Sequence, residues 1–247
     1  MKTVIITGGN KGIGLAITER FVADGYKIIV GARHDTGIEK QFDGHAKFIA
    51  MDVQDEAGHR KLVQAAMDWT GQIDVYVNNA GLSEWRPIQN IDESFFNNLI
   101  GVNLKGAFWG CKVAADSLSK NGVIINVSSI AGKRGSVNNA MYCASKFGMN
   151  GLTQALAKEL GPKSIRVNAV CPVLVSTDGL IDALNGPHSP AKDNTRIFLG
   201  DFAKTQSALG RLPTAEEVGA VCVFLASDKA SAITGQCINV DCGVFPQ

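Results

Sequence analysis

Short apolar runs rich in valine and isoleucine alternate with longer stretches of helical periodicity along almost the whole chain. Successive residues in these runs are apolar, which suits strands that are covered on both faces. Strands of this kind, separated by helices, form a parallel sheet with helices on both sides. The predicted strands are 3–7, 27–30, 47–50, 75–78, 123–127, 166–170 and 237–240, and the predicted helices are 13–24, 58–69, 93–118, 144–160 and 215–226.

The 247 residues contain no internal repeat, low-complexity tract or proline-rich linker, so we expect a single domain over residues 1–247. Residues 176–210 interrupt the alternation, because prolines and glycines are mixed there with charges and isolated apolar residues. A long irregular segment in a compact domain is usually a functional lid or a mobile loop. This one follows the carboxyl end of a strand, where open α/β sheets bind ligands, and we interpret it as a substrate lid. A disordered surface excursion is the alternative.

Charge and composition exclude several classes of protein. Lysine and arginine number 24 against 23 acidic residues, so no bulk electrostatic attraction to nucleic acid or to a membrane surface is expected. The six cysteines form no C-x-x-C pair and the four histidines are scattered, so we expect reduced core cysteines and no metal site. No apolar run approaches the roughly 20 residues that span a bilayer. These features favour a soluble cytoplasmic protein.

A glycine-rich turn follows the first predicted strand. Residues 7–14 read TGGNKGIG and lead directly into a helix. Glycines there permit a tight turn and let backbone N–H groups approach a pyrophosphate. The spacing is a longer variant of the dinucleotide fingerprint, and its place between the first strand and first helix favours cofactor binding over a purely structural turn. Asn78-Asn79-Ala80-Gly81 ends the fourth strand, where small residues allow close approach of an adenine ribose and Asn79 can tie neighbouring strands.

Ser129, Tyr142 and Lys146 form a candidate proton-transfer set. Tyr142 and Lys146 are four residues apart, so a helix places them on one face, and Ser129 follows the fifth predicted strand. Hydride addition to a carbonyl builds negative charge on its oxygen, which Ser129 can hold while Tyr142 delivers the proton. Lowering the pKa of a tyrosine by two units requires roughly 2.7 kcal/mol. A lysine charge about 4 Å away supplies about 4 kcal/mol at an effective dielectric constant near 20, so Lys146 receives an electrostatic role. Asn103 is expected to hold a water that links Lys146 to solvent.

These motifs together resemble the short-chain dehydrogenase/reductase family, and the resemblance extends through RVNAVCPV at 166–173 to the C-terminal segment. It implies a doubly wound, Rossmann-type α/β sheet of about seven strands, NAD(P) as cofactor, and a homotetramer or homodimer. It also implies a catalytic tetrad of Asn103, Ser129, Tyr142 and Lys146. The expected cofactor contacts are Gly8, Asn10, Lys11, Gly12, Ile13, Gly14, Arg33, Asp52, Val53, Asn79, Ala80, Gly81, Tyr142, Lys146, Pro172 and Thr177.

The chain departs from the family pattern at two positions. Val173 follows Pro172 where the family usually has glycine, and this places the nearby nicotinamide contacts in doubt. Cys242 stands between Asp241 and Gly243 where glycine is commoner, a change expected to affect packing between subunits.

The predicted function is a reversible, NADP(H)-dependent oxidoreductase of an alcohol/carbonyl couple. NAD-specific sites commonly carry an acid after the second strand, where this chain has Ala32. Arg33 and Lys11 could hold a 2′-phosphate, although Asp35 lies close enough to turn back toward the ribose. An NAD(H)-dependent dehydrogenase and a non-catalytic dinucleotide-sensing protein are the alternatives.

The expected substrate is a small molecule, either a 3-oxoacyl thioester or a sugar or polyol. Lys133 and Arg134 follow Ser129, and Glu84-Trp85-Arg86 follows the asparagine turn. If these loops border the cleft, an anionic or polyhydroxylated substrate is expected, with Trp85 as a stacking wall. The alternative is that they are solvated loop charges.

Overall fold

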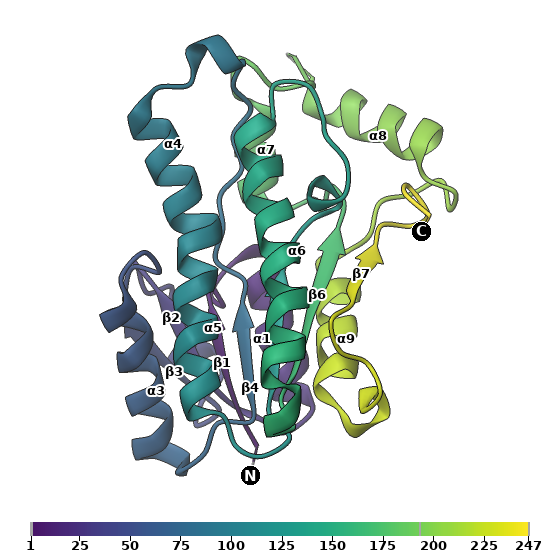
Figure 1. Cartoon of the computed structure of the whole chain (residues 1–247). Helices are drawn as coiled ribbons and strands as arrows, with labels where there is room; N and C mark the ends of the chain where they lie inside the picture. The colour runs from purple at the N-terminus through teal and green to yellow at the C-terminus, as the bar shows by residue number, and fades with distance from the viewer. Residues whose placement is uncertain (1, 193, 247) are drawn as a thin grey trace.

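In the computed structural model, which describes residues 2–192 and 194–246, seven parallel strands form one sheet in the order β3-β2-β1-β4-β5-β6-β7 (Figure 1). This topology confirms the predicted doubly wound, Rossmann-type α/β fold. Three strands extend one or two residues beyond the predicted bounds, and the other four match them. The strands are β1 (Thr3–Thr7), β2 (Lys27–Ala32), β3 (Ala46–Ala50), β4 (Val75–Asn78), β5 (Val123–Val127), β6 (Arg166–Pro172) and β7 (Cys237–Val240).

Helices cover both faces of the sheet. In Figure 1, α5 and α6 cross in front of the strands and α1 lies behind them. The core on one face joins the sheet to α1 and α9, and the core on the other joins it to α3, α5 and α6. The helices are α1 (Gly12–Ala23), α2 (Ile38–Gln41), α3 (Glu56–Thr70), α4 (Glu93–Ile100), α5 (Gly106–Ser117), α6 (Ala140–Leu160), α7 (Asp178–Leu184), α8 (Thr195–Gln206) and α9 (Ala215–Ala226).

The two cores follow from the apolar residues at successive strand positions. In β1, Val4 and Ile6 belong to the core with α1 and α9, whereas Ile5 belongs to the core with α3, α5 and α6. Neighbouring strand residues point to opposite faces, so an unbroken apolar run buries both. All three side chains are fully buried.

The helix predicted over 144–160 begins four residues earlier, at Ala140, and two other predicted segments differ from the structure in kind. The helix predicted over 93–118 is divided into α4 and α5 by a π-helical turn at Gly101–Lys105, and such turns often occur at functional sites. Residues 176–210 were predicted to be irregular, and this was wrong because they contain α7 and α8. The side chains of Thr177 and Asn194 cap these two helices, and the prolines lie in the turn between them.

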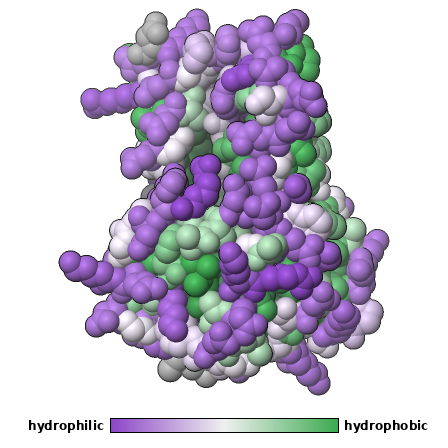
Figure 2. Space-filling view, turned by 90° about the vertical axis from the view of Figure 1, so that its left-hand side faces the viewer, coloured by the Kyte–Doolittle hydropathy of each residue, from purple (hydrophilic) through white to green (hydrophobic). Residues whose placement is uncertain are grey.

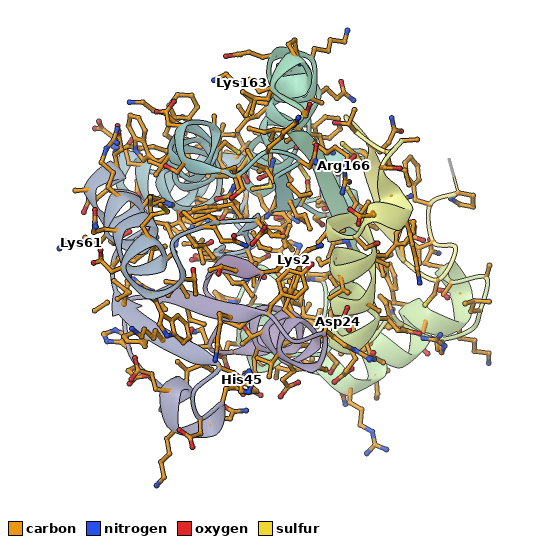
Figure 3. All side chains as sticks on the ribbon, turned by 90° about the horizontal axis from the view of Figure 1, so that it is seen from below. Lys2, Asp24, His45, Lys61, Lys163 and Arg166 are labelled. Atoms are coloured by element: carbon orange, nitrogen blue, oxygen red, sulfur yellow. The ribbon has the colours of Figure 1, made fainter. Side chains whose placement is uncertain are left out.

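The two ends of the sheet differ in character. Figure 3 looks onto the end where the strands begin, where Lys2, Lys163 and Arg166 are labelled. Arg166 donates hydrogen bonds to the carbonyls of Ser227 and Ile233, which holds the start of β6. The carboxyl ends of all strands lie at the opposite end, together with the glycine turn and α7. Within the described ranges, no helix is long and apolar enough to cross a membrane.

Candidate active site

The glycine turn after β1 is a close-packed cradle. Gly8 and Gly12 have φ angles of +64° and +54°, in the left-handed region that favours glycine. A Cβ atom at Gly14 would lie 2.0 Å from the carbonyl oxygen of Gly8. Lys11, which precedes α1, makes no side-chain cap to the helix. The turn and the first N–H groups of α1 therefore form a site that fits a pyrophosphate.

Asn79 and Asn10 tie this turn to the neighbouring strands. Asn79 Nδ2 donates to the carbonyls of Thr7 and Gly8 at 2.9 and 3.1 Å, so Asn79 joins β4 to β1 as expected. The backbone N–H groups of Asn79 and Ala80 donate to Thr7 Oγ1. Asn10 Nδ2 donates to the His34 carbonyl at 2.9 Å. The segment after β2 is thereby held beside the glycine turn.

The segment after β2 presents cationic and neutral groups toward solvent. Ala32 is half-buried at the end of β2, and Arg33 and Lys11 are exposed. Asp35 forms a local bend, in which its Oδ1 accepts from the N–H groups of Gly37 and Ile38.

The segment after β3 packs against α5 and against the π-helical turn at Gly101–Lys105, which contains Asn103. Asp52 Oδ1 accepts from the N–H of Gln54 and shapes the bend. Val53 is buried, and a Cβ atom added at Gly106 would lie 3.0 Å from its side chain. This packing brings Asp52 and Val53 to the same end of the sheet as the glycine turn.

Tyr142 and Lys146 lie in the first turns of α6, facing the end of β5. Lys146 is 4% exposed, and its Nζ donates to the Val127 carbonyl at 2.8 Å. The same Nζ lies 5.7 Å from the centre of the Tyr142 ring. Ser129 lies close enough to Tyr142 to lower the pKa of its hydroxyl, and Ser129 Oγ donates to the Pro172 carbonyl at 3.5 Å. The structure therefore brings together the serine, tyrosine and lysine that the sequence singled out.

Burial controls the ionisation of this group. It lowers the pKa of Lys146 to about 8, because the ammonium loses its hydration. It also raises the pKa of Tyr142 above the usual value, and the nearby Ser129 offsets part of that rise. The lowered pKa that we expected for Tyr142 is not found in the protein chain by itself, because desolvation of the phenolate is the largest effect and Lys146 is not among the groups that shift this pKa.

Asn103 lies in the π-helical turn and is fully buried. Its Oδ1 accepts from the Leu82 N–H and its Nδ2 donates to the Leu82 carbonyl, both at 2.9 Å. Nδ2 also approaches Ser145 Oγ at 3.3 Å. The amide therefore holds the loop after β4 against α6, and the link through water from Lys146 to solvent stays a prediction. Sequence reasoning assigned no role to Ser145, although it lies between Tyr142 and Lys146 in the motif YCASK.

Residues after β6 connect the site to α7. Thr177 caps the start of α7, and its side chain lies 3.5 Å from the place of a Cβ at Gly12, so this end of residues 176–210 faces the glycine turn. Val173, the departure from the family pattern, is buried in an apolar cluster with Ile130 and Val244. The larger side chain thus fills a core position between the site and the C-terminal segment.

Lys133 and Arg134, the two loop cations that we expected near the substrate, contact the C-terminal part of the chain instead. Lys133 Nζ donates to the Cys237 carbonyl at 2.6 Å, and Arg134 stacks on the Phe245 ring. Trp85 is 8% exposed and packs against Leu184 and Ala191, so it anchors α7 to the loop after β4. These contacts remove the reason for expecting an anionic substrate from Lys133 and Arg134.

Glu84 and Arg86 form an ion pair with each other. This agrees with the alternative interpretation of these two residues as loop charges. Among the residues that the structure describes, no group of three or more His, Cys, Asp or Glu side chains could hold a metal ion.

Comparison with known proteins gives full-length matches. Residues 8–245 match the family described as "Enoyl-(Acyl carrier protein) reductase". A putative ketoacyl reductase of the monensin polyketide synthase from Streptomyces virginiae is 37% identical, over 98% of this chain and 96% of its own. L-2,3-Butanediol dehydrogenase of Corynebacterium glutamicum is 34% identical, over 99% and 98%. The crystal structure of a short-chain dehydrogenase/reductase, glucose/ribitol dehydrogenase, from Brucella melitensis superposes with a TM-score of 0.90 at 31% identity, covering 100% of this chain and 97% of that one.

Proposed function

Because the chain belongs to the short-chain dehydrogenase/reductase family, we propose that it is a reversible, NADP(H)-dependent oxidoreductase of a small alcohol or carbonyl compound. Membership makes it an NAD(P)-dependent enzyme that acts on an alcohol/carbonyl couple. The non-catalytic sensor considered from the sequence is therefore set aside. The observation that carries the proposal is the placement of Ser129 and Tyr142 beside the buried Lys146 at the end of β5.

The proposed catalytic roles follow from the positions of these side chains. The dinucleotide, when bound, supplies or accepts the hydride. Ser129 donates a hydrogen bond to the reacting oxygen, and Tyr142 delivers its proton to that oxygen during reduction and accepts one during oxidation. With a pKa of about 8, Lys146 stays mainly protonated at neutral pH and stabilises the phenolate that forms on Tyr142. Asn103 holds the loop after β4 in place through its two hydrogen bonds to Leu82, and this loop borders the site.

The proposed dinucleotide site combines the glycine turn with the segments after β2, β3, β4 and β6. The close approach of Gly14 to the Gly8 carbonyl supports pyrophosphate binding, because it leaves room for no side chain and only backbone groups line the turn there. The contacts named from the sequence remain our proposal for this site, with Asp52 and Val53 toward the adenine and Pro172 and Thr177 toward the nicotinamide.

The preference for NADP(H) is supported by the charges after β2. Ala32 offers no carboxylate to a ribose 2′-hydroxyl, and Arg33 and Lys11 are free to hold a 2′-phosphate. Asp35, the acid nearest in sequence, is engaged by the N–H groups of Gly37 and Ile38. A phosphate requires cations near it, so this arrangement favours NADP(H) over NAD(H).

Steady-state kinetics with NADPH and NADH test the preference. We expect the higher kcat/KM with NADPH, and we expect the double variant Ala32→Asp/Arg33→Ala to reverse the preference. Lys40→Ala is the matched control, since Lys40 is an exposed cation on the nearby α2, and it should leave the preference unchanged. A higher kcat/KM with NADH in the unmodified enzyme would contradict the assignment.

For the substrate, we propose either a 3-oxoacyl thioester or a sugar or polyol. Ketoacyl reductase activity in one relative supports the first, and the names butanediol dehydrogenase and glucose/ribitol dehydrogenase support the second. Oxidation of NADPH by 3-oxoacyl thioesters, measured beside reduction of NADP by sugars and polyols, separates the two classes. Residues 176–210 are proposed to close over the substrate as a lid.

We also propose that the protein forms a homodimer or homotetramer. The side of the molecule in Figure 2 shows green apolar areas between purple hydrophilic ones. A groove of about 670 Å³ lies between α5 and α6, lined mainly by apolar side chains such as Leu104, Phe108 and Leu152. Phe108 is 44% exposed in the single chain. A second copy that buries this groove would remove the apolar side chains from water.

A further inference from the structure

His59, in the first turn of α3, is a fully buried histidine with a partner on each ring nitrogen. Its Nε2 lies 2.9 Å from the Val53 carbonyl oxygen, and its Nδ1 lies 2.7 Å from the Tyr76 hydroxyl oxygen. The Tyr76 side chain is fully buried as well. The proposed catalytic group does not include this pair, which joins α3 to β4 and to the segment after β3.

The partners determine which ring nitrogen of His59 carries the hydrogen. A carbonyl oxygen only accepts, so Nε2 must donate to Val53, and in the neutral ring Nδ1 is then an acceptor. The Tyr76 hydroxyl therefore donates to Nδ1. A second hydrogen on Nδ1 would face the hydroxyl hydrogen of Tyr76, so both contacts of the ring are satisfied as they stand only when His59 is neutral.

The carbonyl that His59 holds belongs to the segment that we assign to the adenine. Met51, at the start of this segment, donates its N–H to the carbonyl at the end of β2 at 2.9 Å. A Cβ atom added at Gly58, the residue before His59, would lie 3.0 Å from the Asp52 carbonyl oxygen, so α3 packs directly on the segment. Asp52 and Val53 therefore lie beside the carboxyl ends of β2 and β3, where open α/β sheets bind ligands.

Burial opposes a positive charge on His59. It lowers the pKa of the ring below the ordinary value of 6.5, because the imidazolium loses its hydration. The Val53 carbonyl and Glu56 act in the opposite direction, and burial is the larger effect. Asp52, the acid in the segment after β3, is not among the groups that shift this pKa. His59 is therefore neutral at neutral pH and takes up a proton only in acid.

The ionisable groups around the pair come from α3, β4 and α5. Glu56, in α3, attracts a proton on the ring, but its carboxylate already accepts from Arg60 and Lys112. Burial raises the pKa of the Tyr76 hydroxyl in β4 and raises that of the Cys111 thiol in α5 to about 12. Both groups are uncharged where histidine titrates, so neither compensates an imidazolium.

We propose that His59 is a positioning residue for the dinucleotide: its neutral ring holds the Val53 carbonyl, and with it the segment that binds the adenine, so that a proton on His59 loosens this segment and weakens binding. The inference rests on the proposed function, because it takes Asp52 and Val53 as adenine contacts. It applies to NADPH and NADH alike, since both carry adenine. By linkage, a bound dinucleotide makes His59 harder to protonate.

The variants His59→Leu and His59→Gln test the hydrogen bond to Val53. Leucine removes the donor, whereas the glutamine amide keeps an N–H near the place of Nε2 and cannot take up a proton. Fluorescence titration with NADPH at pH 7.5 should give a Kd about tenfold higher for His59→Leu, the order that one hydrogen bond supplies, and within about threefold for His59→Gln. At saturating NADPH, kcat should stay within about twofold in both variants, because His59 contacts none of the residues assigned to proton transfer.

Titrations at pH 5 and pH 7.5 test the effect of the proton. As the pH falls, the free protein takes up the proton on His59 before the complex does, so the Kd of the unmodified protein should rise by about threefold or more relative to that of His59→Gln. The NADPH phosphates and the other side chains titrate with both proteins, and their contribution cancels in this ratio. His45→Gln is the matched control, because His45 is exposed at the opposite end of β3 (Figure 3) and should behave like the unmodified protein.

Equal Kd values for the unmodified protein and His59→Leu overturn this inference. A loss of affinity that His59→Gln does not recover also overturns it, because the hydrogen bond to Val53 is then not the cause. A Kd ratio between the unmodified protein and His59→Gln that is the same at both pH values overturns it too, and this ratio decides if His59→Leu does not fold. Turnover of a carbonyl compound leaves the oxidoreductase assignment intact in each case. Failure of the unmodified protein to bind either dinucleotide and to convert any alcohol or carbonyl compound overturns the proposed function itself.

Discussion

Tyr142 is the residue on which the proposed chemistry depends. Tyr142→Phe removes only the hydroxyl that lies near Ser129, so we expect kcat to fall by about 10²- to 10⁴-fold, the range of general acid catalysis. Affinity for NADPH should change little, and fluorescence titration measures it. Tyr26→Phe is the control, since Tyr26 is a buried tyrosine packed on Phe21 at the far end of the sheet. Turnover of Tyr142→Phe near that of the Tyr26 variant would show that another group supplies the proton.

Lys146 should make the stability depend on pH in a defined direction. Its pKa is lowered from 10.5 to about 8 in the folded chain, so between these values the unfolded chain binds the proton and the folded chain does not. The free energy of unfolding contributed by Lys146 therefore rises as the pH increases from about 8 to 10.5. The full span corresponds to about 3 kcal/mol.

Urea unfolding of the protein and of Lys146→Met at pH 7 and pH 10 measures this effect. The variant lacks the buried charge, so its stability relative to the unmodified protein should be greatest at pH 7 and decline toward pH 10. Other titrating groups are common to both proteins and cancel in the comparison. Lys158→Met, an exposed lysine on the same helix, should show no such change. A difference that is independent of pH would mean that Lys146 has the same pKa in the folded and the unfolded chain.

At the scale of elements, the junction of β1 and α1 depends on glycine. Gly14→Ala would place a methyl group 2.0 Å from the Gly8 carbonyl oxygen, so the turn and the helix must separate. We expect a loss of about 1–3 kcal/mol of stability, together with a weakening of NADPH binding of tenfold or more. Gly200→Ala in α8 is the control, because nothing lies within 4 Å of the added methyl group. The control should be slightly stabilised, since alanine favours helix. Unchanged NADPH affinity in Gly14→Ala would argue against pyrophosphate binding at the glycine turn.

Residues 176–210 and the helices α4 and α5 show why some elements were harder to predict. The glycines and prolines of residues 176–210 suggested an irregular segment, yet α7 and α8 form on either side of the turn that contains Pro187 and Pro190. The division between α4 and α5 has no marker in the periodicity, because a π-helical turn adds a residue without ending the helix.

At the scale of the whole molecule, the groove between α5 and α6 predicts association. Phe108→Glu places a charge in this groove, and burying that charge would be costly, so the assembly should dissociate to the single chain. Sedimentation velocity or light scattering measures the mass. Ile88→Glu is the control, because Ile88 is also an exposed apolar residue but does not line the groove. Equal masses for the unmodified protein and both variants would place any interface elsewhere.

The strands, the glycine turn and the spacing of the tetrad were readable in the sequence because each depends on neighbouring residues. An apolar run such as Val4–Ile6 can be buried only between two layers, and this determined the sheet. Tyr142 and Lys146 share a helix face wherever that helix lies, and glycine is needed at Gly14 because the chain turns tightly there. Local geometry therefore determined the fold class, the family resemblance and the candidate catalytic residues.

Only the tertiary structure decided what surrounds those residues. Lys133 reaches Cys237, 104 residues away, and Trp85 packs against Leu184 in α7, so neither can be placed from its own segment. The raised pKa of Tyr142 comes from burial, which is a property of the assembled fold. The two hydrogen bonds of the His59 ring likewise exist only once β4 and the segment after β3 are in place. Long-range packing sets burial and hydrogen-bond partners, and these determine substrate choice and ionisation in ways that no local pattern carries.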